Sequence, residues 1–127
     1  MLFEIQSEKT IDQLCQDLEK AVVNHQFGVM TVHNLRETMK KKGVQFEREC
    51  RIFEVCNPHQ AKRVLESNMQ ISTALPCRIS VYAEEGKVKL ATLKPTALIS
   101  NFNVLELQHV AIEVEDTLIQ IMREAAG

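Results

Sequence analysis

Two cysteines occupy the positions of this sequence that are best suited to chemistry. Cys56 lies in the segment Glu54-Val55-Cys56-Asn57-Pro58, and Cys77 lies in Leu75-Pro76-Cys77. The first segment is typical of a strand that leads into a helix, with asparagine as the N-cap and proline at the first helical position. The positive end of that helix dipole is expected to lower the pKa of the Cys56 thiol. If the strands that carry the two cysteines are neighbours in a sheet, the thiols come close together.

A close pair of thiols suits two kinds of chemistry. With His33 nearby, Cys56 and Cys77 suit a soft cation such as zinc or copper(I), so these two cysteines are the predicted metal ligands. The same pair also suits a cycle between dithiol and disulfide. Asn57 and Glu54 complete the predicted ligand-binding set, with Glu54 as a proton acceptor.

A purely structural role for these cysteines stands beside both chemistries. Free cysteines are often packed and inert, and the sequence has neither a CxxC motif nor paired metal-ligand spacing. Three functions therefore remain open: a binding module for a soft metal or small ligand near Cys56 and Cys77, a thiol redox protein, and an interaction protein with structural cysteines. We favour the binding module. The sequence identifies no catalytic residue, cofactor or reaction, and it leaves open whether the protein is an enzyme.

Composition narrows the classes of partner. The chain has 127 residues, 45% of them hydrophobic and 25% charged, and its formal net charge is −2. We expect one domain spanning residues 1–127, and neither nucleic acid nor an anionic membrane as a partner, because both require a basic surface. No apolar run approaches the length of a spanning helix, and Met1–Ile5 lacks the features of a signal peptide. The expected location is cytoplasmic, where the four cysteines stay reduced.

The hydropathy pattern and capping residues predict the secondary structure. We expect strands at Leu2–Gln6, Phe27–His33, Phe46–Val55, Cys77–Ala83 and Val88–Leu93, the last two joined as a hairpin. We expect helices with N-caps at Ser7, Asn34, Asn57 and Asn103, polar connections at Gln70–Ala74 and Lys94–Phe102, and a left-handed helix stop at Gly43. Because both faces of Phe27–His33 are apolar, we expect this strand to be covered on both sides.

This order of elements favours an α+β fold. We predict a single compact domain with a mainly antiparallel sheet of about five strands, helices packed on one face, and a long C-terminal helix. The second face of the sheet would remain to be covered. A homodimer that packs sheet against sheet would cover it, so we expect a homodimer.

Several short blocks together resemble the bacterial and archaeal domain-of-unknown-function 302 family. The blocks are Phe27-Gly28-Val29 with Thr31-Val32-His33, Lys42-Gly43-Val44, Glu54-Val55-Cys56-Asn57-Pro58 with Ala61, and Leu75-Pro76-Cys77-Arg78-Ile79-Ser80-Val81-Tyr82 followed by Gly86. The resemblance spans Phe27 to Leu93 and implies a TATA-box-binding-protein-like fold and dimers among family members. It implies no established activity, and fold likeness to a DNA binder does not transfer function, because function resides in sites. Family members often carry export signals or extra segments, and we expect neither here.

Overall fold

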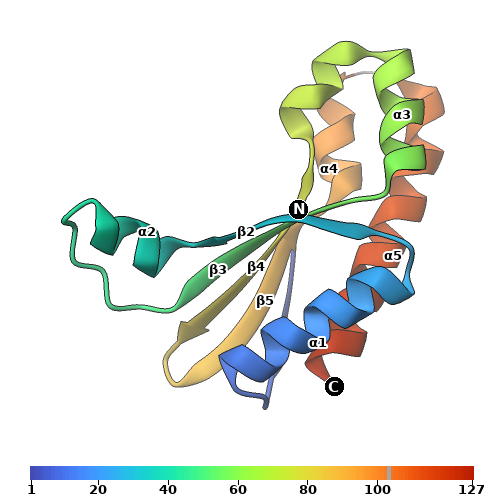
Figure 1. The fold of residues 1–127 in the computed structure, drawn as a ribbon. Coiled ribbons are helices and arrows are strands. Elements are labelled where there is room, and N and C mark those ends of the chain that lie inside the picture. The colour runs from blue at the N-terminus through green and yellow to red at the C-terminus, as the bar shows by residue number, and fades with distance from the viewer. Residues whose placement is uncertain (103) are drawn as a thin grey trace.

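The computed structural model describes residues 1–102 and 104–127 and has the predicted α+β architecture (Figure 1). Its antiparallel sheet has five strands in the order β1-β5-β4-β3-β2. The strands are β1 (Leu2–Ser7), β2 (Gly28–Asn34), β3 (Cys50–Cys56), β4 (Cys77–Glu84) and β5 (Lys87–Leu93). The α-helices are α1 (Ile11–Asn24), α2 (Leu35–Lys41), α3 (Pro58–Ser67), α4 (Pro95–Ile99) and α5 (Gln108–Ala126). The short 3₁₀ helices are η1 (Met69–Ala74), η2 (Ser100–Phe102) and η3 (Leu105–Leu107).

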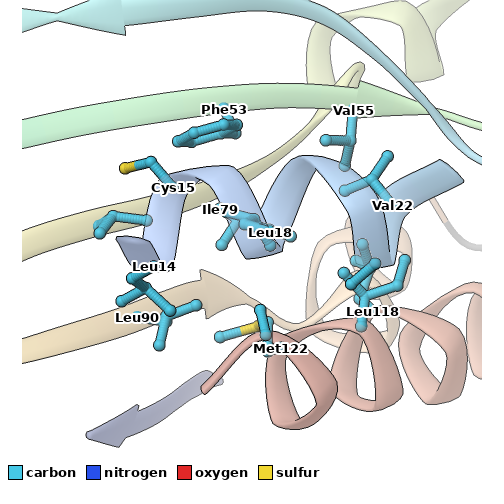
Figure 2. Packing of buried hydrophobic residues seen from close by; sticks show 14 of the residues in the cluster. Leu14, Cys15, Leu18, Val22, Phe53, Val55, Ile79, Leu90, Leu118 and Met122 are labelled. Carbon is cyan, nitrogen blue, oxygen red and sulfur yellow. The ribbon is translucent and has the colours of Figure 1, made fainter. Parts of the chain in front are cut away.

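The register of the sheet separates its residues into a helix-covered face and an open face. Phe53 pairs with Ile79, and Val55 pairs with Cys77, so these four side chains point to the same side. On that side they pack with residues of α1 and of the C-terminal half of α5 (Figure 2). The residues between them in sequence, such as Glu54, point to the opposite, open face.

The apolar interior consists of two clusters. The first joins the sheet to α1 and α5 and includes Leu18, Phe53 and Leu118. The second joins α3, η1, α4, η3 and the N-terminal half of α5 and includes Val64, Ile71 and Ile99. Val114 of α5 packs against both clusters, so this helix connects the sheet layer to the helical layer shown above it in Figure 1.

Most local signals in the sequence are confirmed, with one change of cap. Asn34 accepts a hydrogen bond from the backbone N–H of Glu37, and Gly43 adopts φ +77°, the left-handed stop expected after α2. The N-cap of α1 is Thr10 rather than Ser7, because Thr10 Oγ1 accepts from the N–H of Gln13. Ser7 instead extends β1 and donates to the carbonyl of Ala126.

Three other expectations were wrong. The segment expected as the loop Lys94–Phe102 forms α4 and η2, with Pro95 at the first helical position. The expected polar connection Gln70–Ala74 belongs to η1. The strand expected at Phe46–Val55 begins only at Cys50.

The strand β2 was also expected to be covered on both sides, and it is not. It is an edge strand, and its residues Met30 and Val32 are 63% and 40% exposed. The apolar pattern of β2 therefore does not report burial within this chain.

The predicted cap Asn103 lies outside the described residues, and α5 begins at Gln108. Among the described helices, none combines the length and hydropathy that crossing a membrane requires.

Candidate functional site

An apolar cavity lies where the helical layer meets the ends of β3 and β4. Its volume is about 70 Å³. Val55 and Cys77 form its floor on the sheet, and Val64, Ile99 and Ala111 line it from α3, α4 and α5. The cavity thus occupies the junction between the two apolar clusters. We call it the junction cavity.

Both predicted cysteines line the junction cavity. Cys77 reaches it because its cross-strand partner is Val55, whose side chain faces the helices. Cys56 reaches it from the last position of β3, where the chain turns into α3. Asn57 lines the same cavity. Both cysteines are free thiols, so the structure places three of the predicted site residues around one space.

The other two predicted residues lie elsewhere. His33 Nε2 is 2.6 Å from Glu54 Oε1, and Glu54 Oε2 is 3.9 Å from Arg78 Nε. Glu54 precedes Val55 in β3 and therefore points to the open face, whereas Cys77 points to the helices. The sheet itself separates His33 and Glu54 from Cys77, so the five residues do not form one site.

The two thiols are poorer acids than expected. Burial, with the charge of Cys56 as a smaller cause, raises the pKa of Cys77 to about 11. Burial also raises the pKa of Cys56. The expected lowering of the Cys56 pKa was wrong, because burial of the thiol raises it. At the start of α3, the Oδ1 atom of Asn57 accepts the first-turn N–H groups of His59 and Gln60 at 3.0 and 3.3 Å. At neutral pH both thiols are therefore protonated, and they behave as polarisable, weakly polar wall groups.

The described residues supply no third metal ligand beside the two thiols. Among the described residues, no group of three or more His, Cys, Asp and Glu side chains is placed to hold a metal ion. A structural zinc site generally needs four protein ligands, and a catalytic one needs three. The described geometry therefore gives a zinc site at these two thiols little support.

The cap at Asn57 gives a stability prediction. We expect Asn57→Ala to lower the free energy of unfolding by about 1 kcal/mol, because two first-turn N–H groups lose their acceptor. Urea denaturation followed by circular dichroism measures this change. The matched control is Asn24→Ala, since the Asn24 side chain makes an exposed contact with Glu124, and its expected cost is at most about 0.5 kcal/mol. Equal losses in the two variants would contradict the capping role.

The raised pKa of Cys77 predicts a dependence of stability on alkaline pH. The unfolded thiol ionises near its ordinary pKa of 9.0, whereas the folded thiol stays protonated until about 11. The unfolded state therefore releases its proton first, and stability falls as pH rises between these values, by an amount on the order of 2 kcal/mol. Below pH 9 both states hold the proton and Cys77 contributes no slope.

Urea denaturation at pH 8, 9, 10 and 11 tests this prediction, with Cys77→Ala as the comparison. A hydrogen bond to Glu4 raises the pKa of Tyr82 to about 12, so Tyr82 also contributes at high pH. The difference between wild type and Cys77→Ala removes that contribution. Parallel pH profiles for the two proteins would contradict the raised pKa.

Sequence reasoning missed much of the cavity wall. Ile71 and Ile99 are buried wall residues, yet both fall in segments expected to be connections. Two signals were present. Pro95 and Thr96 precede three apolar residues, a pattern that suits a short helix, and Ile71 is an isolated large apolar residue in a polar segment. Ala111 was assigned to the last helix, but its small size gave no indication that it faces a cavity.

Comparisons with known proteins agree with this fold. A family model described as "Domain of unknown function DUF302" matches residues 3–125. Among solved structures, the chain is similar to an uncharacterized conserved DUF302 protein from Bacillus stearothermophilus, with 30% sequence identity and a TM-score of 0.93. That similarity covers 98% of this chain and 97% of the other. No curated protein matches the sequence.

Proposed function

Because this chain belongs to the DUF302 family, whose description assigns no activity, we propose a function from the cavity itself: the protein is a binding module that receives a small apolar group in the junction cavity. The observation that carries the proposal is the cavity's position and wall. It lies between two packed clusters and is lined mainly by apolar side chains, together with the thiols of Cys56 and Cys77 and the amides of Asn57 and Gln60. Apolar pockets with few polar groups are typical small-molecule sites.

The wall also indicates the character of the ligand. The Cys56 and Cys77 thiols are neutral at physiological pH, and the first N–H groups of α3 are already bound by Asn57. An anionic group would therefore find no free first-turn donor on His59 or Gln60 and would lose its hydration. We infer an uncharged apolar end, no larger than a few heavy atoms, since the cavity measures about 70 Å³.

Xenon tests whether the cavity accepts an apolar guest, because dry apolar cavities bind it. We expect methyl signals of Ile71, Ile99 and Val110, which line the cavity, to shift with xenon pressure in a ¹³C NMR spectrum. The internal control is Leu14 and Leu18, which are fully buried in the first cluster and do not line the cavity. Absence of a shift at the three lining residues, or equal shifts in both groups, would contradict the proposal.

The alternative function, a thiol redox protein that uses Cys56 and Cys77, remains a separate prediction. It requires Cys56 or Cys77 to ionise readily, whereas burial raises the pKa of both. Iodoacetamide alkylation measured against pH tests this alternative. A titration below the ordinary thiol pKa of 9.0 at either cysteine would favour redox chemistry over ligand binding.

We also propose that the protein acts as a homodimer whose open sheet faces pack together. Support comes from the centre of that face, where Ile52 and Ser80 pair across strands and no described helix covers them. Charged side chains also lie on this face, such as Lys89 of β5 and Glu84 of β4, which are 3.1 Å apart. Sedimentation equilibrium should give a dimer that Ile52→Lys converts to a monomer. A wild-type monomer at high micromolar concentration would contradict this.

A further inference from the structure

A second apolar depression adjoins the junction cavity, with which it shares Phe27, Cys56 and Ala61, and lies between the edge strand β2 and helix α3. Phe27, Val29 and Met30 line it from the strand side. Pro58, Ala61, Lys62 and Leu65 line it from α3. We call it the edge groove. It is open to solvent and runs beside a strand that has no second neighbour in the described part of the sheet.

The strand side of the edge groove offers an unused backbone edge. In the described chain, β2 pairs only with β3, so its outward N–H and C=O groups have no strand partner. The register shifts between Val29 and Thr31, and Met30 at this bulge is 63% exposed. Bulges and short lengths discourage indiscriminate pairing of edge strands. The free edge of β2 can therefore pair with a short extended segment, and the exposed side chain of Met30 lies beside that edge.

The helix side supplies a matched wall. Pro58, Ala61, Lys62 and Leu65 are spaced at i, i+3, i+4 and i+7, so they share one face of α3. Three of them are apolar. Lys62 is the one residue with a formal charge among those lining the groove, and its Nζ is 3.7 Å from Glu66 in an exposed pair. An exposed pair of this kind exchanges partners at little cost.

From this arrangement we propose that the edge groove binds an extended peptide by strand addition to β2. The peptide backbone satisfies the free edge of β2, an apolar side chain packs between Met30 and Leu65, and an acidic residue two positions along the peptide, on the same side of the strand, pairs with Lys62. Main-chain hydrogen bonds supply affinity in such complexes, and side-chain pockets supply specificity. This inference needs no ligand in the junction cavity, although the two depressions share Phe27, Cys56 and Ala61.

Charge decides between a peptide and a second copy of this chain as the occupant. The sequence of β2 is Gly-Val-Met-Thr-Val-His-Asn, which contains no carboxylate. If a second copy added its own β2 to this edge, that strand would offer Lys62 no acidic partner. An acidic, apolar peptide from another protein fits the groove better.

Fluorescence anisotropy tests the proposal with a labelled octapeptide probe of threonine and valine that carries a leucine and an aspartate two positions apart at its centre, so that both side chains face the groove. We expect saturable binding with micromolar affinity, together with slower hydrogen exchange of the β2 amides in ¹⁵N NMR spectra. Met30→Lys should weaken binding about tenfold or more. The matched control is Val23→Lys, at an apolar α1 position that is 65% exposed and outside the groove; its affinity should equal that of wild type.

A charge exchange isolates the role of Lys62. Lys62→Glu should weaken the aspartate peptide about fivefold and should favour a peptide with lysine in place of aspartate. The proposal is overturned if saturating peptide leaves the β2 amides unchanged, if Met30→Lys and Val23→Lys bind alike, or if Lys62→Glu shows no exchange of preference. It is also overturned if β2 becomes protected at rising protein concentration without peptide, because a second copy then occupies the edge.

Discussion

Phe53→Ala is expected to lower the free energy of unfolding by about 3–5 kcal/mol, the range for deleting a fully buried phenylalanine. Phe53 is 1% exposed and lies on β3, inside the sheet. Figure 2 shows its ring over α1, close to Cys15. Because surrounding side chains are held by both the sheet and the helices, the space left by the ring cannot close fully. Urea denaturation followed by circular dichroism measures the loss.

Val32→Ala is the matched control for Phe53→Ala. Val32 is the cross-strand partner of Phe53 and points to the same side of the sheet, but it is 40% exposed. We expect it to cost less than about 1 kcal/mol. A cost close to that of Phe53→Ala would mean that β2 is covered in solution, and would contradict its description as an open edge.

Ala111→Leu is expected to abolish binding in the junction cavity, with a loss of affinity of about a hundredfold or more for an apolar guest. Ala111 is 5% exposed, and its methyl group faces the cavity from α5. A leucine there places its added carbon atoms in the same space as the guest. The effect on stability should be smaller, a change of about 1–3 kcal/mol in either direction, because filling a void and crowding its wall oppose each other. Xenon-dependent methyl shifts measure the loss of binding.

Ala97→Leu provides the comparison for this variant. Ala97 is half-buried on α4, the same helix that contributes Leu98 and Ile99 to the cavity wall, but it does not line the cavity. We expect its xenon response to match that of wild type. If both leucine variants lose the response, the loss reflects disturbed packing of the helical layer, and the cavity is not the binding site.

Much of the fold followed from short-range signals. Asn34 and Asn57 cap helices, Gly43 stops one, and Glu84 to Lys87 forms the turn of the β4–β5 hairpin. Each of these caps and turns depends on a few neighbouring residues, so a single sequence is enough to predict it. The α+β class then follows from the order of these elements.

The candidate site was less predictable because it depends on long-range register. Cys77 faces the cavity because it pairs with Val55, and Glu54 faces away because it is one residue earlier. Sequence alone does not specify which residues of two distant strands are opposite each other. The same limit explains why His33 was grouped with the cysteines, although it pairs with Glu54 on the open face.

The pKa of Cys56 shows a different limit. A cysteine before a helix is expected to be acidic, since the dipole favours the thiolate. In the structure, burial raises the pKa of Cys56, and Asn57 accepts the first-turn N–H groups of α3. The sequence reveals the cap and the helix. The burial of the Cys56 thiol depends on residues that are distant in the sequence, so the sign of its pKa shift requires the structure.

Native mass spectrometry of the protein purified under anaerobic, reducing conditions without chelator tests the central claim most directly. It reports subunit number and bound mass together. We predict a small bound organic mass on wild type and Ala97→Leu that is absent from Ala111→Leu. An apo mass for all three proteins under every growth condition, or a bound mass that Ala111→Leu retains, would contradict a binding function for the junction cavity.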